Sequence, residues 1–142
     1  GDPIPAPTPI LKGMETMQTA LGLTPEELEA YRTAARRRHA QEKQALAQRE
    51  QRAWELARRA AALLGAQFGA TRVKVFGSLA HEGYLTPWSD VDIAAWGIRM
   101  EDTFRAIGAV MDISSDIQIN LVDVNTCSTL LLESIEREGI EL

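Results

Sequence analysis

The sequence predicts an α/β fold, of the α+β kind, in which a small mixed sheet with flanking helices follows one long N-terminal helix. Residues 24–65 are mostly strong helix formers without a breaker, and three short runs rich in β-branched residues come after them. Helical patterns or loops separate these runs. Because helices alternate with strands, we expect a sheet packed against helices in layers.

The long helix has clear signals at its start. Thr24 is a suitable N-cap, Pro25 fits the first helical position, and Glu27 completes a capping box. The helix should end near Gly65 and span about forty residues, or about 60 Å. Its last third is apolar enough to cover a sheet, but residues 32–52 offer few apolar side chains beyond alanine. We expect this stretch to pack against a partner or a second copy of the chain, or to kink.

The remaining elements are shorter, and Gly139 is placed to cap the last of them. The expected strands lie within 71–77, 89–97 and 116–124, and the expected helices over 100–112 and 125–139.

The composition suggests three segments. Alternating prolines predict a disordered arm or tag over residues 1–13, because proline fits neither a helix interior nor a sheet interior. Residues 14–68 form a helical segment around the long helix, and residues 69–142 form the sheet domain.

Composition and charge exclude several classes of protein. The 142 residues are 45% hydrophobic and 25% charged, with no apolar run long enough to span a membrane. Cys127 is the single cysteine, which rules out an internal disulfide and fits a cytoplasmic location. Arg36, Arg37 and Arg38 form a basic run, but the acidic second half and the lack of interleaved aromatics argue against nucleic-acid binding.

The most informative stretch is "VFGSLAHEGYLTPWSDVDIAAWG". Asp90 and Asp92 are two residues apart, so on a strand both carboxylates leave the same face. Two anions side by side need a cation, and Mg²⁺ prefers oxygen ligands completed by substrate phosphates. Upstream, Gly77 lets the backbone approach a ligand, while the following N–H groups and the Ser78 hydroxyl are suited to phosphate oxygens.

The order strand, Gly-Ser, short helix, Gly, loop and Ser-Asp-x-Asp resembles the signature of the DNA polymerase β-like nucleotidyltransferase superfamily, most closely its minimal nucleotidyltransferase (MNT) family. The resemblance covers about residues 70–142. It implies transfer of a nucleoside monophosphate, usually AMP from ATP, to a hydroxyl. In that scheme Ser78 and Gly77 bind the nucleotide together with Ser89, and Asp90 and Asp92 hold the divalent ions.

The resemblance also implies a partner. Proteins of this kind are often the antitoxin half of a toxin–antitoxin pair whose other half is a HEPN ribonuclease, and some adenylylate a tyrosine on it. Such a partner, or self-association, would give the poorly covered part of the long helix something to bury.

The sequence departs from the family at the third carboxylate, where "IQINLVDV" has Asn120. Asparagine can ligate a metal weakly but cannot take up the acceptor's proton. Asp116 shares the face of Asn120 but lies four residues away, and Asp123 has the opposite parity, so only a bulge or bend would let either replace it. The sequence therefore predicts the binding site but not whether the protein catalyses the transfer. The alternative is a homologue with impaired catalysis that acts as a binding protein, masking its partner, or as a dimeric scaffold.

Other residues near the motif have two interpretations. His81 is either a surface-loop histidine or a contact of the phosphate site. Tyr84 and Trp88 either wall the nucleotide pocket or pack on the sheet. Transfer to a small hydroxyl compound would need an acceptor-binding domain that the remaining residues hardly provide.

Overall fold

The structure, a computed structural model, describes residues 22–142, and the arm expected over residues 1–13 lies outside this range. The chain divides into two compact units, whose boundary in the sequence lies between Lys43 and Gln44. Helix α2 (Pro25–Phe68) contributes its N-terminal half to the first unit and its C-terminal half to the second. The second unit contains the whole sheet.

Helix α2 begins as predicted and ends later. The hydroxyl of Thr24 accepts a hydrogen bond from the Glu27 amide at 3.1 Å, and the Glu27 carboxylate accepts one from the Thr24 amide at 3.4 Å, which completes the capping box. The helix passes Gly65 and ends at Phe68, so the prediction was about one turn short. The extra turn buries the Phe68 ring, and Gly69 then ends the helix with φ +71°.

The strands form one mixed sheet, as the sequence predicted, but there are four of them rather than three. They are β1 (Arg72–Phe76), β2 (Val91–Trp96), β3 (Ile119–Asp123) and β4 (Ile140–Glu141), in the order β3-β2-β1-β4. Strand β1 pairs antiparallel with β2 and β4, and β2 pairs parallel with β3. Strand β4 was not predicted, since two residues carry no period to detect.

The other helices start later than predicted. Residues 100–102 form a 3₁₀ turn before α3 (Thr103–Met111), and α4 (Thr129–Glu138) starts after Ser128, whose side chain accepts from the Leu131 amide at 3.1 Å. Gly139 does follow α4, but with φ −70° rather than in the left-handed region. A Cβ there would lie 2.5 Å from the Ile135 carbonyl oxygen, so close approach explains the glycine.

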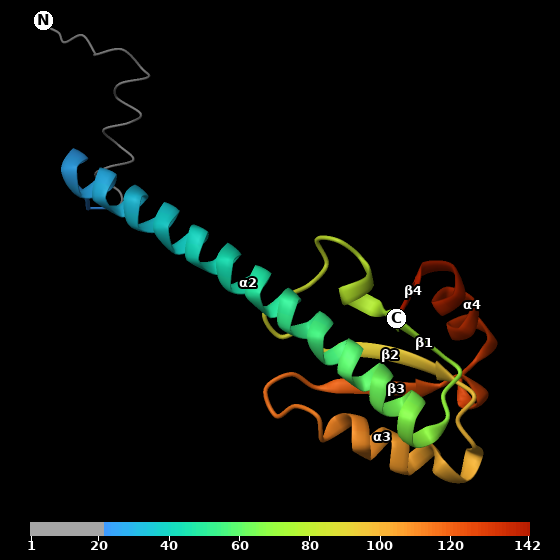
Figure 1. Cartoon of the computed structure of the whole chain (residues 1–142). Coiled ribbons are helices and arrows are strands. Elements are labelled where there is room, and N and C mark those ends of the chain that lie inside the picture. Colours follow the sequence, from blue (N-terminus) through green and yellow to red (C-terminus); the bar gives the residue numbers. More distant parts are fainter. Residues whose placement is uncertain (1–21) are drawn as a thin grey trace, which may run out of the picture. The chain divides into compact units, whose positions relative to one another are not determined.

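One face of the sheet carries the core of the second unit. The C-terminal half of α2 and helix α3 lie over this face (Figure 1), and their side chains join the core. Alternate residues of β1, β2 and β3 supply this core, because side chains along a strand alternate between the two faces of the sheet. The central buried residues are Leu56, Ala60, Leu64, Val75, Val91, Ile93, Ala106, Val110 and Ile119. None of the helices within residues 22–142 combines the length and apolar character needed to cross a membrane.

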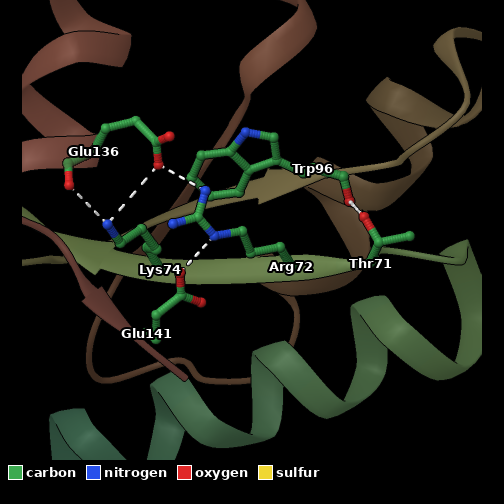
Figure 2. Close-up of polar contacts among 6 residues, drawn as sticks. All are labelled: Thr71, Arg72, Lys74, Trp96, Glu136 and Glu141. Atoms are coloured by element: carbon green, nitrogen blue, oxygen red, sulfur yellow. Dashed lines mark hydrogen bonds and ion pairs between the residues drawn. The ribbon is translucent and has the colours of Figure 1, made fainter.

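The opposite face of the sheet is polar where α4 lies over β1 (Figure 2). The Arg72 guanidinium stacks 4.5 Å from the centre of the Trp96 ring and pairs with Glu136 at 2.7 Å and with Glu141. These carboxylates, Glu141 first, raise the pKa of Arg72. Lys74, only 5% exposed, donates from Nζ to the Glu136 carbonyl oxygen at 2.9 Å. Charged side chains from β1 therefore attach α4 and β4 to this face.

Candidate functional site

The two aspartates of the motif converge at the start of β2. Asp92 is paired with Asn120 of the parallel strand β3, and Asp90 comes just before β2. The Asn120 Nδ2 lies 3.3 Å from Asp90 Oδ2 and 3.1 Å from Asp92 Oδ1. One amide group thus touches both carboxylates, which confirms that they leave the same face of the sheet. All three side chains are half-buried.

Gln118 extends this contact into a chain of hydrogen bonds. Its Nε2 donates to Asn120 Oδ1 at 2.7 Å, which leaves the amide hydrogens of Asn120 for the two aspartates. Gln118 and Asn120 are two residues apart, as are Asp90 and Asp92, and Asp92 is paired with Asn120 across the two strands. All four side chains therefore share one face. The amide of Asn120 therefore donates to both carboxylates at the position where the resemblance implies a third carboxylate.

Neither Asp116 nor Asp123 replaces Asn120. Asp123 is buried on the other face of β3, where it accepts from the Thr103 hydroxyl at 2.8 Å and the Asn125 amide at 3.0 Å. Asp116 is bonded to the Ser114 hydroxyl and lies 3.7 Å from Arg52. The structure thus contains no bulge that brings either carboxylate to the site, and within residues 22–142 no cluster of three or more His, Cys, Asp and Glu side chains is placed to hold a metal.

The glycine-serine bend lies directly against Asp92. Gly77 starts a 3₁₀ turn, Gly77–Ala80, at the end of β1, where Phe76 is paired with Asp92. It has φ +72°, and a Cβ on it would lie 2.5 Å from Asp92 Oδ2. Glycine is required here for two reasons, its left-handed backbone and the carboxylate beside it. The bend and the acid pair, separate in sequence, are therefore neighbours.

The other predicted nucleotide contacts are placed differently. Ser78 follows Gly77 in the turn, is half-buried, and its carbonyl accepts from the His81 amide at 3.2 Å. The Ser89 hydroxyl is used within its own loop, where it lies 2.8 Å from both the amide nitrogen and the hydroxyl oxygen of Thr86. Ser89 thus closes the turn before Asp90.

The loop between the bend and the acid pair carries aromatic side chains. Tyr84 is 70% exposed and Trp88 is 79% exposed, so neither packs on the sheet, one of the two interpretations the sequence allowed. The His81 ring meets the Tyr84 ring edge-on at 5.6 Å between centres, and its Nε2 lies 3.4 Å from Glu138 Oε2. His81 therefore faces α4 rather than standing free on the surface.

Arg49 is a neighbour of the site that the sequence analysis missed. Its Nη2 donates to the Ser89 carbonyl oxygen at 2.9 Å, immediately before Asp90. Its Nε is buried without a hydrogen-bond partner among residues 22–142, at a cost of about 1–3 kcal/mol for such a group. A signal was present, because Arg49 lies on the helical stripe that continues through the buried Ala53 and Leu56.

The donor set is compatible with a divalent ion. Two carboxylates on one face are hard oxygen ligands of the type that Mg²⁺ takes. The amide of Asn120 now presents nitrogen to them, but the amides of Gln118 and Asn120 can rotate together. Rotation would keep the hydrogen bond between the two amides and direct the carbonyl oxygen of Asn120 to the aspartates. Asp90, Asp92 and Asn120 are thus the residues that would hold the ion.

The chain shows limited similarity to known proteins. No protein-family model and no curated protein matches the sequence. One similar solved structure is a toxin–antitoxin with AMP-PNP, which is 22% identical over 57% of this chain and 67% of that chain, with a TM-score of 0.48. Another is a mutant of the toxin–antitoxin MntA–HpeT, 24% identical over 60% of this chain and 69% of that chain, with a TM-score of 0.49. Likeness of this degree concerns the backbone arrangement only.

Proposed function

We propose that the second unit binds a magnesium–nucleotide at Asp90 and Asp92 and is a nucleotidyltransferase that transfers an adenylyl group from ATP to a hydroxyl. One observation carries this proposal: two carboxylates converge on one amide directly beside the bend at Gly77. Because Gly77 carries no side chain, the backbone of the bend contacts the Asp92 carboxylate, and a phosphate chain bound by the bend would lie beside a cation held by the two anions.

In the proposed reaction the residues of this chain bind and orient. Gly77 and Ser78 hold the phosphate tail, and Asp90 and Asp92 hold the ion. Bound Mg²⁺ would supply Lewis acidity at the phosphates. The acceptor oxygen forms a bond to the α-phosphorus as the bond to pyrophosphate breaks, and the hydroxyl proton passes to solvent water, since Asn120 cannot take it up.

Asn120 limits what the site can do. An amide does not take up the proton of the attacking hydroxyl at neutral pH, and it adds no negative charge for the ion. This favours a second candidate function, in which the domain binds nucleotide and partner without efficient transfer. The partner we propose is a HEPN-like toxin, for which this chain acts as the antitoxin. The support is that no residue of α2 before Ala53 is buried. The same helix surface would serve self-association if the partner is a second copy.

Calorimetry with ATP and Mg²⁺ tests the binding site. We expect the wild-type chain to bind Mg·ATP and the double variant Asp90→Asn with Asp92→Asn to lose at least about a hundredfold in affinity, since both charged ligands disappear while side-chain shape is kept. A matched control is Asp112→Asn, an exposed aspartate at the end of α3. Equal affinity of the double variant and the wild type would refute the site.

Asn120→Asp separates transfer from binding alone. If transfer is limited by the missing carboxylate, this variant should bind the divalent ion more tightly and transfer labelled AMP to a co-purified partner about ten to a hundred times faster. If the variant gains ion affinity without any transfer while the wild type still binds its partner, the binding function is supported instead.

A further inference from the structure

A side chain from α2 holds the backbone next to the acid pair. Arg49 Nη2 donates to the Ser89 carbonyl oxygen at 2.9 Å, across 40 positions of sequence. That oxygen belongs to the same rigid peptide plane as the Asp90 nitrogen. On the other side of Asp90, the Val91 amide donates to the Gln118 carbonyl oxygen at 2.9 Å. The backbone of Asp90 is thus held from both ends.

We propose that Arg49 is a positioning residue for the acid pair: by holding the Ser89 carbonyl, it sets the direction in which the Asp90 carboxylate faces Asp92 and Asn120. This inference rests on the proposed function, because positioning matters only if the pair binds a ligand. Arg49 acts through Ser89.

The loop before the site explains why such an anchor is needed. The Ser89 amide donates to the Thr86 carbonyl at 3.1 Å and its hydroxyl contacts Thr86 at 2.8 Å, so the turn fixes the N-terminal side of Ser89 by itself. These bonds leave the next peptide plane free to rotate. Among residues 22–142, the bond from Arg49 is the one hydrogen bond to that plane, and the exposed Tyr84 and Trp88 add no packing to it.

Stability alone does not account for this arginine. An apolar side chain of similar length would remove the buried Nε–H, which has no acceptor among the described residues, but it would also leave the Ser89 carbonyl without its donor. The two effects on stability therefore oppose each other. The next arginine of the helix, Arg52, makes a contrast. It reaches Asp116 at 3.7 Å between two exposed side chains, an arrangement that contributes little.

The test uses the full chain with Arg49→Met, Arg49→Lys and, as a control, Arg58→Met at an exposed position of the same helix. Three quantities are measured: the thermal midpoint, hydrogen exchange of residues 86–92, and the Kd of Mg·ATP by calorimetry. We expect Arg49→Met to change the midpoint little, to speed exchange of this segment about tenfold, and to weaken Mg·ATP binding about tenfold. Arg49→Lys should restore the exchange rate and the affinity of the wild type, because an ammonium can donate to the same carbonyl. Arg58→Met should change none of the three measured quantities.

The results that overturn the inference are distinct from those that overturn the proposed function. Unchanged exchange of residues 86–92 in Arg49→Met would show that Arg49 does not hold the segment. Faster exchange with unchanged affinity, or a lower midpoint with faster exchange across the whole sheet, would show a structural role only. If the wild type itself does not bind Mg·ATP, the proposed function fails, and with it the positioning role. The exchange measurement then still shows whether Arg49 orders the segment.

Discussion

Gly77 and Asp92 occupy their places in a way that leaves no room for a side chain between them. The glycine has φ +72°, and the carboxylate oxygen of Asp92 fills the space that a Cβ would take. Such close contact between a backbone and a carboxylate is better explained by a ligand site than by packing. At the scale of single residues, Gly77 is therefore the position of the site with the strictest requirement for one residue type.

Gly77→Ala should lower the free energy of unfolding by about 1–3 kcal/mol and weaken Mg·ATP binding, because a left-handed backbone is strained with a Cβ and Asp92 must move. Gly83→Ala is a matched control with φ +85° and no atom within 4 Å of the added Cβ. It should show the backbone strain alone. Chemical denaturation and calorimetry measure the two effects, and equal binding losses in both variants would contradict the role of Gly77.

Asp116 offers a pH-dependent prediction. The Ser114 hydroxyl, together with the Asp116 backbone amide and the more distant Arg52, holds the pKa of the Asp116 carboxyl below its ordinary value of 3.8. A lowered folded-state pKa means that the contribution to stability is present above the unfolded pKa, near 4, and is lost as pH falls through the folded pKa.

Ser114→Ala should raise the pKa of Asp116 toward its ordinary value, as followed by NMR titration of its carboxyl carbon. Ser115→Ala, an exposed neighbour, should leave it in place. Since both carboxyl and partner are exposed, the change in stability at neutral pH should be small. A pKa of Asp116 that stays low in Ser114→Ala would assign the shift to the Asp116 backbone amide and Arg52 instead.

Much of the site was predictable at this scale, and the reasons differ between residues. The common face of Asp90, Asp92 and Asn120 follows from strand periodicity, which needs no tertiary information. The rejection of Asp123 also followed from parity. The hydrogen bond from Arg49 could not be predicted from the sequence. It joins α2 to a loop 40 residues away and depends on how the helix crosses the sheet.

Among the elements, α4 depends most on charged contacts. Ile135 is its only fully buried residue, and Lys74 and Arg72 of β1 attach it through Glu136 (Figure 2). Lys74 reaches a carbonyl of the last turn, where helices leave acceptors unpaired. A short helix that buries so little of its apolar surface is thus kept in place by two cations of one strand.

Lys74→Met should destabilise the chain by about 1–2 kcal/mol, because the apolar stem is kept while the Glu136 carbonyl loses its donor. The loss should appear first as faster hydrogen exchange in α4 and β4. Arg137→Met in the same helix removes an exposed charge and should change stability by less than about 0.5 kcal/mol. Equal effects of the two variants would show that the buried contact adds nothing.

Sequence patterns located the elements better than their ends. The extra turn of α2 follows from burial of Phe68, and the late start of α4 follows from capping by Ser128. Both depend on what the ends contact. Strand β4 could not be found from pattern, since its two residues are defined by pairing with β1.

At the scale of the whole molecule, the two units differ in what they bury. The second unit holds the core, whereas no described residue before Ala53 is buried. Apolar burial is the main favourable term in folding. We therefore expect the part of α2 before Gln44 to be dispensable for folding of the sheet unit.

A chain that begins at Gln44 should keep the sheet and unfold within about 5 °C of the full chain, because it loses no buried side chain. A chain that begins at Arg58 removes Ala53, Leu56 and Ala57, all buried, and should fail to fold stably. Circular dichroism melts and hydrogen exchange check both. Loss of self-association or of partner capture in the first truncation would assign that role to the removed part of α2, and unfolding of the first truncation would contradict the division into units.

The sequence by itself determined the fold class, the start of α2, the common face of the acid pair and the place of Gly77. These depend on local chemistry: capping, periods of two or 3.6 residues, and the freedom of glycine. Only the tertiary structure decided that Gly77 lies against Asp92, that the Asn120 amide binds both carboxylates, and that Arg49 holds the peptide before Asp90. Those contacts join segments far apart in the chain, and their distances follow from strand register and helix packing, which no local pattern specifies.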